Sequence, residues 1–204
     1  MSNETRKNNL VAFLALLAIV LPNAGCTASK TAAGQEAPGT PAPKGTMVHG
    51  ALASDGHQRT YHLYLPGSLD SHKPAPIVLV FHGAHYSNPE PTINQAAETG
   101  RFIAVYPDTI GGHLVVNGED VSNEWNAGIC CGQSVPVGID DVGFVNRLLD
   151  DLSRSYRIDP SRVYAMGLRN GGGMSLRLGC ELSNRIAAIG AVAGPFMPAQ
   201  CHPS

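Results

Sequence analysis

The stretch Val163-Tyr-Ala-Met-Gly-Leu-Arg-Asn-Gly171 lies where a short apolar segment meets the start of a helix. Residues 163–166 are predicted to be a strand and residues 171 to about 182 a helix. In sheets covered by helices, ligands and catalytic groups gather where a strand ends and a helix begins. The junction at residues 167–171 is therefore the first place to look for a functional site.

The sequence around this junction alternates predicted strands and helices. Residues 59–66 alternate in polarity, as in a half-exposed strand near a sheet edge, whereas residues 77–81 are continuously apolar, as in a strand buried on both faces. The further predicted elements are strands at 102–106 and 186–192 and helices at 91–99, ended by Gly100, and at 140–156. This alternation predicts an α/β fold, a parallel sheet with helices on both faces.

The N-terminus is predicted to be an export signal. An uninterrupted apolar run spans residues 10–21, after Arg6 and Lys7. At ~1.5 Å per residue the run covers about 18 Å, short of the ~30 Å hydrocarbon core of a membrane, so residues 1–25 fit a cleaved signal peptide. Small residues before Cys26 resemble a bacterial lipoprotein cleavage box, which would leave Cys26 as a lipid anchor; an ordinary signal peptide with an incidental cysteine is the alternative. Either reading predicts an extracellular, periplasmic or cell-surface location, with membrane contact only through that anchor.

Residues 26–46 are rich in Ala, Pro, Gly and Thr and are predicted to be a flexible linker, because they cannot bury enough apolar surface to offset their ordering entropy. Residues 47–204 are then the folded domain. The whole chain has 204 residues, 43% of them hydrophobic, and a net charge of −2. This composition excludes an ordinary disordered protein and lacks the basic field that nucleic-acid binding needs.

The junction has the spacing of a G-x-S-x-G nucleophile elbow, in which flanking glycines allow a sharp turn to hold a serine at a helix N-terminus. Arg169 stands in the serine position. A guanidinium stays protonated and has no free lone pair with which to attack a carbonyl. The sequence therefore predicts an inactivating substitution; attraction of a carboxylate by this cation is the alternative.

Several other segments occur in the order found in one family of secreted enzymes. They are Phe81-His-Gly83, Val105-Tyr-Pro-Asp108, Trp125-Asn-Ala-Gly-Ile-Cys-Cys-Gly132, Asp140-Asp-Val-Gly-Phe144, Ile158-Asp-Pro-Ser-Arg-Val-Tyr164, Asn170-Gly-Gly172 and Cys180-Glu-Leu-Ser183. Over residues 48–201 the chain resembles the α/β-hydrolase esterases of the polyhydroxybutyrate depolymerase, feruloyl esterase and acetylxylan esterase type.

This resemblance implies ester hydrolysis through an acyl-serine intermediate, with no metal or organic cofactor and with a small-molecule or polymeric ester as substrate. It also implies an oxyanion hole formed by the backbone N–H groups of Ala84 and Asn170, which would stabilise the charge that develops during acyl transfer. Trp125 lies in a loop that the resemblance places near the substrate groove. Stacking of Trp125 on an aromatic acyl group or a sugar is one expectation, and a half-buried packing role is the other.

The other members of a catalytic triad are not evident. In this fold the acid and the histidine follow the nucleophile, and after Asn170 the sequence has only Glu181 and His202. Glu181 is expected to be a solvated charge at a helix end, and Ser175 a packing residue inside the helix. We therefore expect a truncated domain that lacks the last strands of the family and is catalytically deficient; a non-catalytic surface protein that binds aryl esters or cell-wall polysaccharide is the alternative.

Four cysteines lie in the predicted domain, and in an exported protein they suggest two disulfides. Adjacent Cys130 and Cys131 are too close to pair without strain, because consecutive Cα atoms are ~3.8 Å apart. Cross-pairing with Cys180 and Cys201 is expected, in an order that the sequence leaves open. The spacing lacks a C-x-x-C pair, so no zinc site is predicted. Asp140 and Asp141 are expected to be helix-start residues rather than paired catalytic acids.

Overall fold

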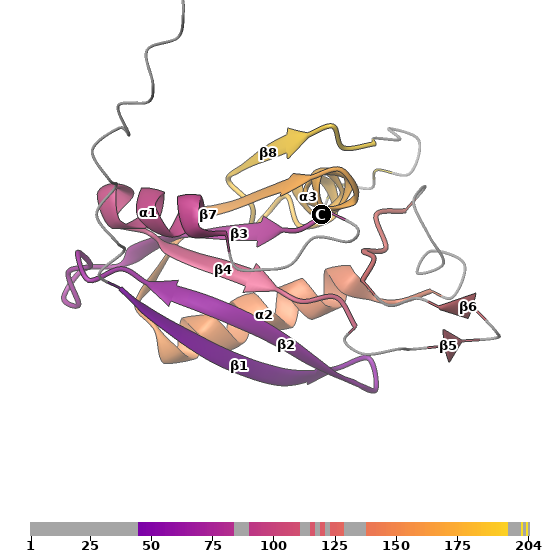
Figure 1. The fold of residues 1–204 in the computed structure, drawn as a ribbon, viewed down its shortest axis with the longest axis horizontal. Coiled ribbons are helices and arrows are strands. Elements are labelled where there is room, and N and C mark those ends of the chain that lie inside the picture. Colours follow the sequence, from indigo (N-terminus) through magenta and orange to yellow (C-terminus); the bar gives the residue numbers. More distant parts are fainter. Residues whose placement is uncertain are drawn as a thin grey trace, which may run out of the picture. The chain divides into compact units, whose positions relative to one another are not determined.

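Six strands pair into one sheet (Figure 1) in a computed structural model that describes residues 45–83, 90–110, 115–116, 119–120, 123–128, 138–195, 201 and 203. The order across the sheet is β1-β2-β4-β3-β7-β8. The strands are β1 (Thr46–Ser54), β2 (His57–Leu65), β3 (Ala75–Phe81), β4 (Ile103–Pro107), β7 (Ile158–Leu168) and β8 (Ala188–Val192), and a separate pair is formed by β5 (Val115–Val116) and β6 (Glu119–Asp120). The predicted signal peptide, Cys26 and all but the last residues of the predicted linker lie outside the described residues.

The sheet is mixed rather than wholly parallel. Strands β4, β3, β7 and β8 run parallel, as predicted, whereas β1 pairs antiparallel with β2 and β2 antiparallel with β4. The prediction placed β2 near the sheet edge and overlooked β1, which occupies that edge. The missed signal is Asp55-Gly56, which turns the β1–β2 hairpin with φ angles of 51° and 74°. An Asp-Gly pair between alternating segments is typical of a two-residue hairpin turn, because both positions need positive φ.

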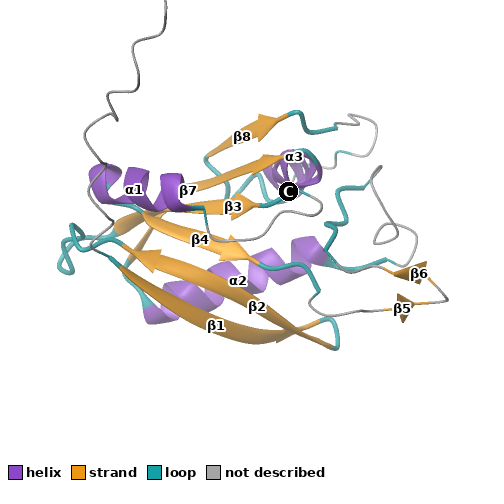
Figure 2. Ribbon diagram, in the orientation of Figure 1, coloured by secondary structure: helices purple, strands orange, loops and turns teal. Residues whose placement is uncertain are grey.

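Three helices cover the two faces of the sheet (Figure 2): α1 (Pro91–Gly100), α2 (Asp141–Ser155) and α3 (Asn170–Glu181). Leu148 of α2 and Met174 of α3 pack with the side chains of one sheet face in the larger core. Ala97 of α1 packs with Val80 and Tyr106 in a smaller core on the other face. The predicted α/β architecture with helices on both faces is thus confirmed.

Helix α1 ends one residue later than predicted. Gly100 is its last helical residue, and Arg101 follows in the left-handed conformation at φ 53° and ψ 50°. The cap is completed by the backbone N–H of Arg101, which bonds to the carbonyl oxygen of Ala97. An arginine therefore occupies the position that usually favours glycine, and its side chain projects from the end of the helix.

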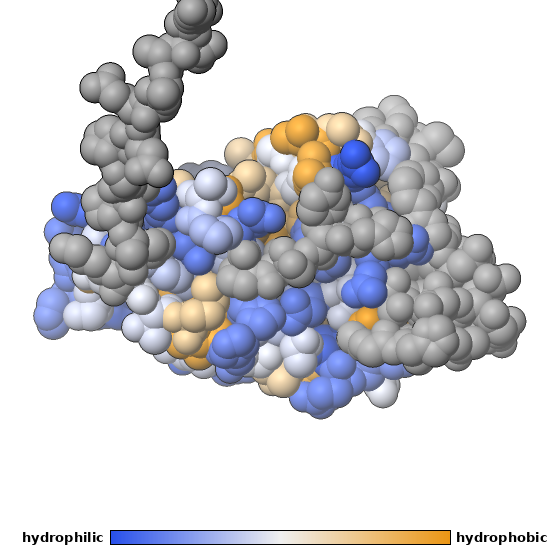
Figure 3. Space-filling view, viewed as in Figure 1, coloured by the Kyte–Doolittle hydropathy of each residue, from blue (hydrophilic) through white to orange (hydrophobic). Residues whose placement is uncertain are grey.

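Strand β8 is the outer strand of the parallel half of the sheet. All five of its residues are exposed, including Val192 at 59%. Figure 3 shows apolar surface over β8, and Leu168 and Ile189 are further exposed large apolar residues. An apolar strand with no charged residue and an open edge favours edge-to-edge association. None of the helices in the described part of the chain is long and apolar enough to cross a membrane.

Candidate active site at the β7–α3 elbow

The turn between β7 and α3 has the geometry of a nucleophile elbow. Arg169 occupies the turn with φ 54° and ψ −118°, a conformation that costs a residue with a side chain about 1–3 kcal/mol. Its backbone N–H donates to the carbonyl oxygen of Val192 at 2.8 Å, which ties the turn to β8. Its side chain is exposed. The arginine is therefore presented at the carboxyl end of the parallel strands, where a nucleophile would stand.

Two glycines allow this turn to pack closely against the end of β3. A Cβ atom on Gly167 would collide with the main chain of Gly171, and a Cβ atom on Gly171 would collide with the carbonyl oxygens of Phe81 and His82. The glycine spacing is thus required by the approach of three backbone segments. The turn thus has the shape of the predicted elbow, with Arg169 in the position predicted for the nucleophile.

The strain at position 169 can be measured by comparing Arg169→Gly with Arg169→Ala. Both variants lose the side chain, but only glycine adopts the positive φ without strain. We expect Arg169→Gly to have a free energy of unfolding about 1–2 kcal/mol above that of Arg169→Ala, the reverse of the usual order in a helix or strand. Urea unfolding followed by circular dichroism measures both. Equal stabilities, or a more stable alanine variant, would show that the turn relaxes to an ordinary conformation.

Asn170, the first residue of α3, is buried directly behind the elbow. Its side-chain oxygen accepts a hydrogen bond from the backbone N–H of Trp125 at 2.7 Å, and its side-chain nitrogen donates to the carbonyl oxygen of Trp125 at 3.0 Å. Its own backbone N–H is one of the first four of the helix, and these N–H groups have no hydrogen-bond acceptor within the helix. This position suits the predicted oxyanion role, but the second predicted donor, Ala84, lies outside the described residues. The two-donor oxyanion hole therefore stays a prediction.

Trp125 is a packing residue of the core beneath the elbow. Its ring is 0% exposed and meets the Phe81 ring edge to face, with centroids 5.1 Å apart. Its indole N–H donates to the carbonyl oxygen of His82 at 3.1 Å. A ring with no exposed face leaves nothing for a sugar or an acyl group to stack on, so the geometry favours packing over substrate binding. Trp125 thereby links the end of β3 to Asn170.

A buried ion pair holds the segment that contains Trp125 and Asn126. Arg59 and Asp141 are 2% and 1% exposed, and their side chains meet at 2.7 Å. The other carboxylate oxygen of Asp141 accepts the backbone N–H of Asn126 at 2.7 Å, and the guanidinium of Arg59 lies 4.0 Å over the centroid of the Phe144 ring. Burial raises the pKa of Asp141, while the charge of Arg59 opposes the rise. The pair anchors the loop that carries Trp125.

Sequence reasoning overlooked this ion pair. Asp140 does cap α2, because its side chain accepts the backbone N–H of Gly143 at 2.8 Å, as a helix-start residue should. Asp141 is the first residue of α2, so it is also a helix-start residue as predicted, but its side chain is buried in the core, which the sequence did not reveal. The available signal was Arg59, which shares the inward face of β2 with Tyr61 and Leu63 at a spacing of two residues.

Of the remaining candidates for catalysis, the two that the structure describes are both engaged in other contacts. Ser175 is fully buried, and its hydroxyl donates to the carbonyl oxygen of Gly171 at 2.9 Å. Glu181 forms an ion pair with Arg177 at 2.6 Å, one helical turn away. His202 lies outside the described residues. Among the described residues no group of His, Cys, Asp and Glu side chains has the arrangement of a metal site.

A disulfide joins the end of α3 to the C-terminal segment. Cys180 pairs with Cys201, with Cα atoms 5.6 Å apart. The predicted presence of a disulfide is confirmed, but the predicted cross-pairing of Cys180 and Cys201 with Cys130 and Cys131 was wrong. Sequence spacing carries no information on which Cα atoms the fold brings within bonding range. Cys130 and Cys131 lie outside the described residues.

Comparison with known proteins finds distant relatives among esterases. No model of a known protein family matches the chain. The candidate esterase NocK of Nocardia uniformis subsp. tsuyamanensis is 28% identical over 228 residues, an alignment covering 100% of this chain and 62% of NocK. A poly(3-hydroxybutyrate) depolymerase of Ralstonia pickettii is 47% identical over 58 residues, 26% of this chain and 12% of that protein.

A solved structure shares the fold. The ferulic acid esterase of Anaeromyces mucronatus, in complex with ferulic acid, superposes with a TM-score of 0.52 and 21% identity, over 74% of this chain and 58% of that one. The chain thus spans less than two thirds of the length of these proteins. By its sequence relatives and its fold, the chain is a relative of the α/β-hydrolase esterases of the polyhydroxybutyrate depolymerase and feruloyl esterase type.

Proposed function

We propose that this chain is an esterase-family protein that does not hydrolyse esters through its nucleophile elbow. The observation that carries the proposal is Arg169, which occupies the turn at φ 54° and ψ −118° at the start of α3. The side chain that the fold presents at this point cannot form an acyl intermediate. The esterase relatives supply the reaction class, and the arginine argues against its first step.

The chemical reason is that acyl transfer needs a lone pair at this position. A serine hydroxyl attacks the carbonyl carbon once a base accepts its proton, and backbone N–H donors then stabilise the oxyanion. A guanidinium such as that of Arg169 has no free lone pair with which to attack a carbonyl carbon, because its nitrogen lone pairs are delocalised. The nearest serine along α3, Ser175, is buried with its hydroxyl engaged, so it offers no substitute.

Hydrolysis of p-nitrophenyl acetate and methyl ferulate by the purified chain tests this proposal, together with labelling by a fluorophosphonate. We expect rates equal to buffer alone and no label on the chain. Ser175→Ala is the matched control, because it removes the nearest hydroxyl on α3 and leaves residue 169 unchanged. Turnover that persists in Arg169→Ala would overturn the proposal, since another residue would then be the nucleophile. Labelling of Arg169→Ser would identify the arginine as the defect at the elbow.

The second candidate is a binding protein for aryl esters or cell-wall polysaccharide. One feature favours it: a cation stands at the positive end of the α3 dipole, beside the Asn170 N–H group, in an elbow that keeps its shape. Such a site would hold an oxyanion or carboxylate without reacting with it. Saturable binding of methyl ferulate or ferulate, measured by calorimetry and weakened by Arg169→Ala, would support this function. Heat changes that do not saturate would count against it.

We further propose that the chain is exported and held at a membrane surface by lipid on Cys26. The support is the apolar run at residues 10–21 followed by small residues before the cysteine. Expression in a bacterium followed by cell fractionation, with the Cys26→Ser variant as control, tests this localisation. We expect wild-type protein in the membrane fraction and the variant outside it. The same distribution for both proteins would contradict the lipid anchor and favour an ordinary signal peptide.

A further inference from the structure

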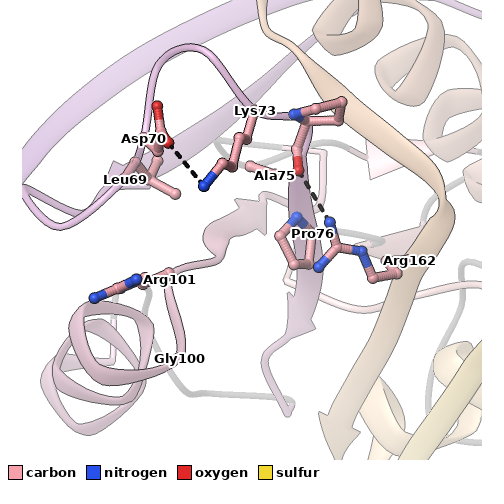
Figure 4. A pocket seen from close by; sticks show the side chains of 9 residues that line it. Leu69, Asp70, Lys73, Ala75, Pro76, Gly100, Arg101 and Arg162 are labelled. Atoms are coloured by element: carbon pink, nitrogen blue, oxygen red, sulfur yellow. Dashed lines mark hydrogen bonds and ion pairs between the residues drawn. The ribbon is translucent and has the colours of Figure 1, made fainter.

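A pocket of about 290 Å³ opens at the N-terminal ends of the parallel strands, whereas the elbow lies at their C-terminal ends (Figure 4). It lies between the segment that leads into β3, the end of α1 and the first half of β7. Strands β3 and β7 run parallel from this pocket toward the elbow, so the two sites are at opposite ends of the same strands. The lining residues are Leu69, Asp70, Lys73, Pro74, Ala75, Pro76, Gly100, Arg101 and Arg162.

The rim of the pocket is predominantly cationic. Lys73, Arg101 and Arg162 contribute three positive side chains; Asp70 pairs with Lys73, and Asp159 pairs with Arg162. The charge of Arg101, like that of Lys73, acts on the carboxylate of Asp70. Lys73 pairs with Asp70 at 3.3 Å, but both side chains are exposed, and such surface pairs contribute only about 0–1 kcal/mol. Lys73 can therefore turn toward a bound anion at little cost.

Arg162 is held in place, unlike the other two cations. Its Nε donates to Asp159 at 2.7 Å, and one of its terminal nitrogens donates to the carbonyl oxygen of Pro74 at 3.0 Å. Figure 4 shows its side chain lying beside Pro76, whereas the side chain of Arg101 extends from the end of α1 and points away from Pro76 in this view. The pocket thus has one fixed cation against its wall and two adjustable cations at its entrance.

The wall is apolar. Leu69, Pro74, Ala75 and Pro76 line it with aliphatic carbon and rigid proline rings, which offer surface for burial but no side-chain hydrogen bonds. Inorganic anions gain nothing from such a wall, because they have no apolar surface to bury. A volume near the lower limit for ligand pockets restricts the occupant to a small molecule. The combination fits a compact apolar body with one negative charge.

We propose that this pocket binds a small organic carboxylate, with its apolar body against Pro74 and Pro76 and its charge toward Arg101. The site is separate from the elbow and does not depend on the function proposed for it. Binding here would give the chain a second ligand site without requiring chemistry at Arg169.

Titration of the ¹⁵N-labelled chain with sodium benzoate, followed by two-dimensional NMR, tests the proposal. Saturable shifts are expected at residues 69–76 and 100–101, with affinity in the millimolar range. Benzyl alcohol, which lacks the charge, and inorganic phosphate, which lacks the apolar body, should each bind at least about threefold more weakly, as the loss of roughly 0.7 kcal/mol implies. Shifts at residues 167–172 would report the elbow separately.

Arg101→Gln and Arg154→Gln form the matched pair of variants. Both remove an exposed arginine, but Arg154 lies on α2 beside Asp151, away from the pocket. Arg101→Gln should weaken benzoate binding at least about threefold, while Arg154→Gln leaves it unchanged; the same spectra show that each variant is folded. Equal effects of the two substitutions, equal binding of phosphate and benzoate, or shifts confined to other regions would overturn the proposal.

Discussion

Asp141→Ala is expected to lower the free energy of unfolding by about 3–5 kcal/mol, the usual cost of removing one partner of a buried ion pair. The substitution leaves the buried guanidinium of Arg59 without its carboxylate, at a site where Arg59 Nε already has no hydrogen-bond partner in the described structure. It also removes the acceptor of the Asn126 backbone N–H. Urea unfolding monitored by far-ultraviolet circular dichroism measures the loss.

Asp150→Ala is the control for this prediction. Asp150 lies on the same helix and pairs with Arg185 at 2.8 Å, but its side chain is exposed. Its removal should cost no more than about 1 kcal/mol. The double variant Arg59→Met with Asp141→Leu should lose less stability than Asp141→Ala alone, because no charge is then left buried. A loss below about 1 kcal/mol for Asp141→Ala would contradict the role assigned to the pair.

Trp125→Ala is expected to be about as damaging, at about 3–5 kcal/mol, because it leaves a cavity in a fully buried site. It also removes the hydrogen bond from the indole to the carbonyl oxygen of His82. Trp125→Phe retains a ring against Phe81 and loses chiefly that hydrogen bond, so it should cost less, about 1–3 kcal/mol. Circular dichroism is the suitable probe, since Trp125 is the only tryptophan of the chain.

The same pair of variants separates packing from substrate binding. If Trp125 stacked on a ligand at the surface, Trp125→Ala would weaken ligand binding and leave the urea midpoint almost unchanged. If it packs in the core, the midpoint falls first and any loss of binding follows from unfolding. An alanine variant as stable as the wild type would contradict the packing role of Trp125 and favour a role in substrate binding.

These two residues belong to one chain of contacts that ends at the elbow. Asp141 accepts a hydrogen bond from the backbone N–H of Asn126. The backbone N–H and carbonyl groups of the neighbouring Trp125 are both hydrogen-bonded to the side chain of Asn170. Asn170 directly follows the position where a nucleophile would stand. These hydrogen bonds hold the residue that follows the elbow in place, although Arg169 occupies the turn. A site that is held in place but carries no nucleophile is the reason to consider ligand binding as well as lost catalysis.

The local pattern of the sequence was enough to predict the order of most elements and the elbow itself. Apolar runs such as residues 77–81, the helical spacing of α2 and the glycines at 167 and 171 act over a few residues, so a pattern of neighbours reveals them. The hairpin of β1 and β2 was predictable on the same grounds from Asp55-Gly56, although it was overlooked. The arginine in the serine position of the G-x-S-x-G pattern could be recognised from the sequence alone.

Only the tertiary structure decided which distant residues meet. The antiparallel pairing of β2 with β4, the Arg59–Asp141 ion pair, the burial of Trp125 and the Cys180–Cys201 disulfide all join segments far apart in the chain. An aspartate at a helix start looks the same in sequence whether it faces water or a buried arginine. Its role is set by the packing of α2 against the sheet, because charge, burial and hydrogen-bond partners are properties of the neighbours that folding supplies.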